Sequence, residues 1–190
     1  VDAAGIWNGF LESTEEEYIK KVKEALDEKE MVVPNIAVDQ ASVWDDDPEQ
    51  REKFHQNALA HLEAAKILEA DSVRIDWGVR KPDLTEEQFD FIVKRYREYC
   101  EIAAEAGIKV GPENHFGAAL NPDLMIKVLE AVNKPNYKIL LHLGHWEGIE
   151  EKKGDEMLAP HAVHTHVPQK VVEGNLEERL KILIDNGYDN

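Results

Sequence analysis

The sequence is poor in cysteine, in long apolar runs and in positive charge. Cys100 is the only cysteine among 190 residues, which excludes an internal disulfide framework and predicts a reducing, cytoplasmic location. No apolar run approaches the roughly 18 residues of a membrane-spanning helix, and no basic-then-apolar leader is evident. The 22 Lys and Arg against 39 Asp and Glu leave a net charge of −17, which should repel nucleic acid phosphates and anionic lipid.

Several activity motifs are missing as well. The sequence contains no Gly-rich phosphate loop, no serine nucleophile elbow and no basic stripe interleaved with aromatics. These absences disfavour nucleotide binding, triad hydrolysis and nucleic acid binding. What is present is a hydrophobic fraction of 43% with four Trp, enough to bury a core. We expect one folded domain over residues 1–190.

Short apolar runs alternate with helical patterns along the chain. The expected strands cover residues 3–10, 32–38, 72–77, 108–114, 138–143 and 162–167. The expected helices cover residues 15–29, 48–69, 85–106, 121–133 and 175–186, with a shorter one after Trp146. Capping boxes are predicted at Thr14–Glu17 and at Thr85–Gln88. This alternation is typical of βαβ units and a parallel sheet.

The faces of the strands favour a closed barrel over an open sheet. Strands of an open parallel sheet are apolar on both faces, whereas Arg74 and Asp76 alternate with Val73, Ile75 and Trp77. In a barrel, such polar faces point inward and gather at the C-terminal mouth. We therefore predict an α/β fold, a (β/α)8 TIM barrel. Such barrels take about 250 residues, so about six parallel strands are expected here, without the first and eighth, in a domain truncated at both ends.

Histidines concentrate in the second half of the chain. Six of the eight fall between residues 115 and 166: His115, His142, His145, His161, His164 and His166. A single histidine at a strand end is more often structural than a ligand, but Glu113, His142 and His166 share the inward pattern on three strands. Carboxylate and imidazole together suit a divalent metal such as Zn²⁺ or Mn²⁺. His55 and His61 lie in a Lys- and Glu-rich helix and are expected to be solvated.

Three further residues have two interpretations. Arg74 and Asp76 could form a buried ion pair, or Arg74 could hold a substrate oxygen, since guanidinium suits oxyanions. Trp146 could form the wall of a sugar pocket, or simply pack in the core, which is the commoner role of tryptophan.

Four segments together resemble the xylose-isomerase-like TIM barrels, the superfamily of sugar phosphate isomerases and epimerases that also includes endonuclease IV. Residues 107–115, GIKVGPENH, are similar to its fifth strand, and residues 70–74 to its fourth. Residues 141–145, LHLGH, are similar to its sixth strand, and residues 164–167 to its seventh. The resemblance covers nearly the whole chain, in the right order and spacing.

The resemblance implies a divalent metal at the barrel mouth, with Glu113 and His166 as ligands. The family's sixth strand supplies an Asp followed three residues later by a His; here His142 takes the Asp position and His145 matches the His. Gly5 stands where the family often has a Glu on its second strand. Residues 176–189 match the approach to an eighth strand, which in the family carries a metal-binding Glu.

The expected function is therefore a divalent-metal-dependent isomerase or epimerase of a sugar, polyol or keto-sugar, acting through a metal-stabilised enediolate. Mn²⁺ or Zn²⁺ is expected ahead of Mg²⁺ or Co²⁺. Glu113 and His145 are the candidate catalytic residues, and Arg74, His115 and Trp146 the candidate substrate contacts. The alternatives are a lyase or dehydratase of a keto-polyol or keto-glycoside, and a catalytically silent barrel subunit.

The expected partner is a small-molecule carbohydrate, with neither nucleic acid nor membrane. An activity like that of endonuclease IV would need a basic face, and the net charge of −17 argues against one. Missing strands would expose sheet edges, which are compatible with a homo-oligomer.

Overall fold

The computed structural model describes residues 2–188, so Val1, Asp189 and Asn190 lie outside the described residues. Each expected strand is present but shorter than predicted, because only part of each predicted range forms ladder hydrogen bonds. Residues 8–10, for example, form a 3₁₀ turn instead of continuing the first strand. The strands are β1 (Ile6–Trp7), β2 (Ile36–Val38), β3 (Ser72–Ile75), β4 (Lys109–Gly111), β5 (Ile139–His142) and β6 (Ala162–His166).

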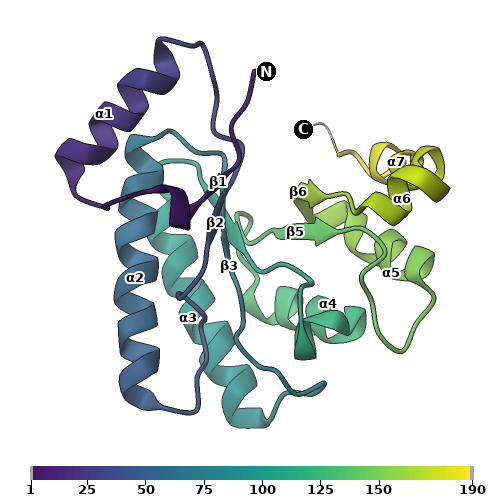
Figure 1. Cartoon of the computed structure of the whole chain (residues 1–190). Helices are drawn as coiled ribbons and strands as arrows, with labels where there is room; N and C mark the ends of the chain where they lie inside the picture. Colours follow the sequence, from purple (N-terminus) through teal and green to yellow (C-terminus); the bar gives the residue numbers. More distant parts are fainter. Residues whose placement is uncertain (1, 189–190) are drawn as a thin grey trace.

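The strands are parallel and follow one another in chain order. β1, β2, β3 and β4 form a four-stranded sheet in that order, and β5 pairs with β6. Parallel bridges from Val110 to Tyr137 and from Glu113 to Leu140 connect β4 to β5. Across residues 2–188 no ladder joins β6 back to β1. The expected incomplete (β/α) barrel is thus confirmed, as an open arc of strands between α1–α3 on one side and α4–α7 on the other (Figure 1).

The helices form the outer layer, with neighbours in sequence packing against each other. The predicted capping box at α3 is confirmed, since Gln88 N–H donates to Thr85 Oγ1 and Thr85 N–H to Gln88 Oε1. The one at Thr14 is wrong, because Glu15 is the N-cap and makes no side-chain cap bond. The helices are α1 (Glu16–Asp27), α2 (Pro48–Ile67), α3 (Glu86–Ala104), α4 (Pro122–Val132), α5 (Glu151–Leu158), α6 (Gln169–Gly174) and α7 (Leu176–Asp185). Within the described part of the chain, none of them is long and apolar enough to cross a bilayer.

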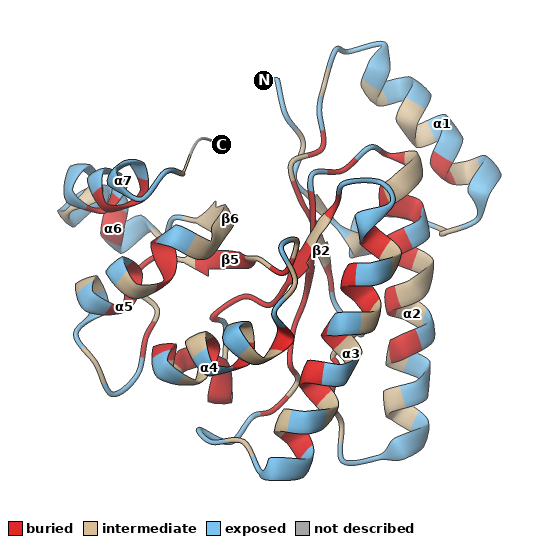
Figure 2. Cartoon of the chain, turned by 180° about the vertical axis from the view of Figure 1, so that it is seen from behind, coloured by how far each residue is buried: buried red, intermediate tan, exposed pale blue. Residues whose placement is uncertain are grey.

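The core lies between the strands and the helices, whose buried residues face the sheet (Figure 2). β4 and β5 approach each other very closely at Gly111. A β-carbon added there would lie 1.5 Å from the carbonyl oxygen of Lys138. Only glycine allows this approach, which positions Glu113 and His142 just beyond it.

His55 and His61 are buried, so the expectation that they are solvated is wrong. His61 is 4% exposed and donates from Nδ1 to the carbonyl oxygen of Asn57. The Arg95 guanidinium donates to Nε2 of His55, whose Nδ1–H therefore donates to Tyr99 Oη. Small alanines dominate the buried face of α2, and their weak hydrophobic signal hid the inward direction of both histidines. Burial lowers the pKa of both imidazoles below their ordinary value.

Protein stability should therefore fall as the pH drops below about 6.5, the ordinary pKa of an unfolded histidine. The unfolded chain binds these protons more readily than the folded one, so the free energy of unfolding rises with pH across this window. Urea unfolding of the wild type and of His61→Gln between pH 5 and 7 tests this. The variant should show a shallower dependence on pH, and parallel curves would contradict the assignment.

Candidate functional site

Glu113 is the central residue of the site and lies two residues past the end of β4. Its backbone N–H donates to Asp76 Oδ1 at 3.0 Å, and its side chain is only 2% exposed. The bridge to Leu140 fixes its position against β5. The chain therefore places a carboxylate in the interior of the arc, at the C-terminal ends of the strands, where barrel active sites are built.

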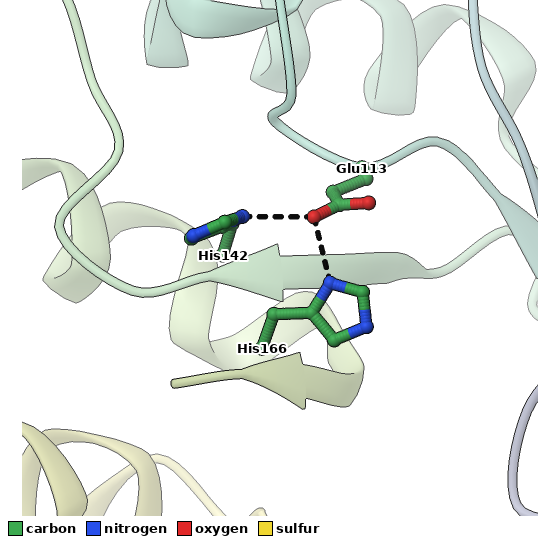
Figure 3. Close-up of side chains that lie close together, drawn as sticks. All are labelled: Glu113, His142 and His166. Carbon is green, nitrogen blue, oxygen red and sulfur yellow. Dashed lines mark hydrogen bonds and ion pairs between the residues drawn. The ribbon is translucent and has the colours of Figure 1, made fainter. Parts of the chain in front are cut away.

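Two imidazoles meet the same oxygen of Glu113. Nδ1–H of His142, at the end of β5, donates to Glu113 Oε1 at 2.9 Å, and Nδ1–H of His166, at the end of β6, donates to it at 2.8 Å (Figure 3). The β5–β6 register pairs His142 with His166 directly. One donor atom from each of the three residues lies within 4.8 Å of the other two. These are the three residues that the inward pattern of the strands predicted to converge.

The charge on Glu113 is strongly stabilised. Burial alone would raise the pKa of this carboxyl, but the hydrogen bonds from His142 and His166 and the nearby Arg74 outweigh it. Together they hold the pKa of Glu113 well below its ordinary value. The carboxylate is thus ionised across the physiological range, as a metal ligand requires.

Arg74 lies beside Glu113 and is bound by the protein's own carboxylates. Its Nη2 donates to Asp39 Oδ1 at 2.9 Å and its Nη1 to Asp76 Oδ2, while Nε lies 3.7 Å from Glu113 Oε2. Although burial opposes it, these carboxylates raise the pKa of Arg74. The geometry supports the buried ion pair of the two interpretations, since carboxylates hold both terminal nitrogens of the guanidinium, while Nε has no hydrogen-bond partner.

His145 and His115 lie on the open side of the site. Nε2–H of His145 donates to the carbonyl oxygen of His115 at 3.0 Å, and its ring centre lies 4.8 Å from that of His142. His115 is half-exposed, with Nδ1 3.7 Å from Glu113 Oε2. The Asp76 carboxylate, 3.8 Å from the same nitrogen, is the main reason that the pKa of His115 is raised.

A cavity of about 280 Å³ opens next to this group, beyond the ends of β2 and β3. His115 and Arg74 belong both to its wall and to the surroundings of Glu113 Oε2, and Asp76 of the same wall accepts the Glu113 backbone N–H. The rest of the wall includes Asp39, Trp44 and Phe116. Glu113 thus presents one oxygen to the two imidazoles and the other to residues that line the cavity.

Trp146 is placed differently from the expectation that it walls the substrate pocket. It is buried in the core, and its indole N–H donates to Asp155 Oδ1 at 2.8 Å. The core-packing alternative describes its environment. Its neighbour Gly144 also donates its N–H to Asp155, so a fully buried carboxylate holds the segment on either side of His145.

Asn114 is a site residue that the sequence analysis did not single out. Its amide donates to the carbonyl oxygens of His142 and His145 at 2.8 and 3.0 Å, and its Oδ1 accepts His142 N–H at 2.7 Å. It therefore fixes the backbone of both histidines. One signal in the sequence could have indicated its role. Asn114 is a polar residue at a strand end, between Glu113 and His115, on the face where an apolar residue would be expected to pack against the helices.

Comparison with solved structures gives several barrels of similar fold. The 3-keto-D-glucoside 4-epimerase YcjR from E. coli matches with a TM-score of 0.81 at 15% identity, over 100% of this chain and 79% of that one. AsbF, a probable 3-DHS dehydratase from Bacillus anthracis involved in petrobactin synthesis, matches at 0.74 and 19%, over 98% and 80%. The IOLI protein, solved with a bound zinc atom, matches at 0.76 and 14%, over 100% and 77%.

At these identities the likeness shows the fold alone. A search of curated proteins found no match to this sequence. The family described as xylose isomerase-like TIM barrel matches the sequence over residues 2–189, nearly its full length. On that match, and on the open barrel with its carboxylate and imidazoles at the mouth, the chain belongs to the xylose isomerase-like TIM barrel family.

Proposed function

We propose that the chain is a divalent-metal-dependent isomerase or epimerase of a sugar or keto-polyol. The observation that carries this proposal is the convergence of Glu113, His142 and His166 at the ends of three successive strands, with donor atoms within 4.8 Å of one another. One buried carboxylate and two imidazoles fit Zn²⁺ or Mn²⁺ better than Mg²⁺, which prefers oxygen ligands. Among similar barrels, IOLI was solved with zinc and one from Mycobacterium smegmatis with magnesium, so the choice of ion here depends on the ligand types.

When bound, the ion would act as a Lewis acid on adjacent carbonyl and hydroxyl oxygens of the substrate. The chain's own residues supply the remaining functions. His115 faces the cavity with a raised pKa, so it can donate a hydrogen bond to a substrate oxygen. We assign to His145, whose Nε2–H is bound to the His115 carbonyl oxygen, the role of moving a proton at the substrate.

Glu113 serves as a ligand in this proposal and no longer as the base. Its Oε1 accepts from two imidazoles, and its Oε2 faces the Arg74 guanidinium and His115. As a metal ligand, Glu113 would give its charge and a lone pair to the ion, so we assign it no proton transfer from carbon. Proton transfer is therefore assigned to His145, and the substrate contacts to His115 and the cavity wall. Arg74 belongs to that wall but is held by Asp39 and Asp76, and Trp146 is buried in the core.

A dehydratase is the second candidate, favoured by the similar fold of AsbF. Both reactions begin by removing a proton next to a carbonyl group. They diverge afterwards, since a dehydratase expels a hydroxyl group from the neighbouring carbon and an epimerase returns the proton.

The test is exchange of carbon-bound hydrogen with solvent. Protein loaded with Zn²⁺ or Mn²⁺ is incubated in D₂O with ketoses, inososes and keto-glycosides, and NMR follows deuterium entry next to the carbonyl. Exchange on at least one substrate is expected, and dehydration would appear as a new alkene signal. A metal-loaded protein that exchanges no hydrogen in any substrate would indicate a catalytically silent barrel.

Replacing His145 separates catalysis from metal binding. His145→Ala should slow the exchange by about 10²–10⁴-fold, the usual contribution of a general acid or base. Its affinity for the ion should stay near that of the wild type, because the donor set does not include His145. Exchange at the wild-type rate would show that another group moves the proton.

A further inference from the structure

Asp76 is a buried carboxylate that is not one of the three candidate metal ligands. It contacts Glu113, Arg74 and His115. It follows the last residue of β3 and is 7% exposed. Its Oδ1 accepts the backbone N–H of Glu113 at 3.0 Å, and its Oδ2 accepts Nη1 of Arg74. Its own backbone carbonyl accepts Val43 N–H at 2.9 Å, so the position of Asp76 does not depend on Glu113.

Arg74 is a buried cation beside Glu113 that could compete with a metal ion for its carboxylate. Its Nε is buried without a hydrogen-bond partner and lies 3.7 Å from Glu113 Oε2. A guanidinium binds a carboxylate best through two parallel N–H···O bonds, which would take both oxygens of Glu113. Instead, Nη1 is bound to Asp76 and Nη2 to Asp39, which keeps the guanidinium from that arrangement.

We propose that Asp76 is a positioning residue that keeps Glu113 available as a metal ligand; this rests on the function proposed above. One oxygen of Asp76 fixes the backbone of Glu113, and the other retains the Arg74 guanidinium. Glu113 Oε2 therefore faces Arg74 without a hydrogen bond to it. Oε1 remains directed to His142 and His166. Groups that orient metal ligands in this way typically contribute about 10–100-fold in affinity.

The test uses Asp76→Asn, which keeps an oxygen for the Glu113 N–H but removes the charge that retains Arg74. Zn²⁺ affinity is measured by competition with a chromophoric chelator, and the visible spectrum of the Co²⁺-loaded protein reports the coordination. We expect affinity to fall about 10–100-fold, with a changed Co²⁺ spectrum. Asp71→Asn, an exposed carboxylate at the start of the same strand segment, is the matched control and should bind like the wild type.

The double variant Arg74→Gln/Asp76→Asn distinguishes competition from general damage. Removing the competing guanidinium should bring Zn²⁺ affinity back to within about threefold of the wild type, a non-additive result expected only for coupled groups. Far-UV circular dichroism and thermal unfolding verify that each protein is folded. If Asp76→Asn does not fold, the Zn²⁺ affinity of the double variant alone tests the role of Asp76. The proposal requires the double variant to bind Zn²⁺ within about threefold of the wild type.

The outcomes separate the two proposals. Wild-type protein that binds neither Zn²⁺ nor Co²⁺ would overturn the proposed function, and this inference with it. Wild-type binding that is unchanged in Asp76→Asn, or lost in the folded double variant, would overturn the role of Asp76 and leave the metal site standing.

Discussion

Glu113→Gln should lower the affinity for Zn²⁺ by more than about 100-fold. Glu113 supplies the only carboxylate among the three candidate ligands. Replacing even a residue that only hydrogen-bonds to a ligand usually lowers metal affinity by about 10–100-fold. Gln has nearly the same shape and can still accept a hydrogen bond from an imidazole, so a loss of affinity would report the missing charge. Isothermal titration calorimetry with Zn²⁺, on protein first stripped by a chelator, measures the effect.

The matched control is Glu147→Gln, an exposed carboxylate in the segment that follows His145. It should bind Zn²⁺ as the wild type does. His142→Ala and His166→Ala should each weaken binding in the same direction as Glu113→Gln. A Glu113→Gln protein that keeps its affinity within tenfold would show that the ion binds elsewhere.

Asp155→Ala should lower the free energy of unfolding by about 3–5 kcal/mol, the usual cost of removing one partner from a buried ion pair. Asp155 is fully buried and accepts from Gly144 N–H, from Trp146 and, at 2.7 Å, from Nη1 of Arg179. Arg179 is itself buried, so the alanine variant would leave its charge uncompensated. Urea unfolding at neutral pH measures the difference.

Asp185→Ala is the control for this prediction. Asp185 forms an exposed pair with Lys181 in the last turn of α7, and such pairs contribute about 0–1 kcal/mol. The Asp155→Ala protein should also catalyse the exchange of substrate carbon-bound hydrogen with solvent more slowly. Asp155 holds the residues on both sides of His145, to which we assign the proton transfer. If Asp155→Ala and Asp185→Ala have the same free energy of unfolding, the Asp155–Arg179 pair stabilises the fold far less than its burial implies.

The convergence of Glu113, His142 and His166 was accessible to prediction because it depends on two simple regularities. Side chains alternate across a strand, and the C-terminal ends of parallel strands meet at one mouth. His142 and His166 lie at equivalent positions of neighbouring strands, and Glu113 stands just past a third, so their convergence required no knowledge of side-chain packing. The order of strands and helices followed from the same periodicities.

Other features depend on contacts that no periodicity encodes. Trp146, in the segment after β5, and Arg179, in α7, converge on Asp155 of α5, and nothing in their spacing indicates this. Arg74 was ambiguous because its role depends on how many carboxylates reach it, and Asp39 lies 35 residues away. The burial of His61 was missed because the buried face of α2 consists largely of alanines, whose weak hydrophobicity leaves no clear apolar stripe.

The close approach of β4 and β5 at Gly111 bears on the sizes of ion that the site can accept. With the Lys138 carbonyl oxygen filling the space of a side chain, the two strands cannot move closer. Glu113 and His142 therefore extend from backbone whose spacing is fixed at this point. If the proposed site holds an ion, this fixed spacing should favour ions with bonds of about 2.0–2.2 Å, as zinc forms, over calcium, whose bonds run to about 2.3–2.6 Å.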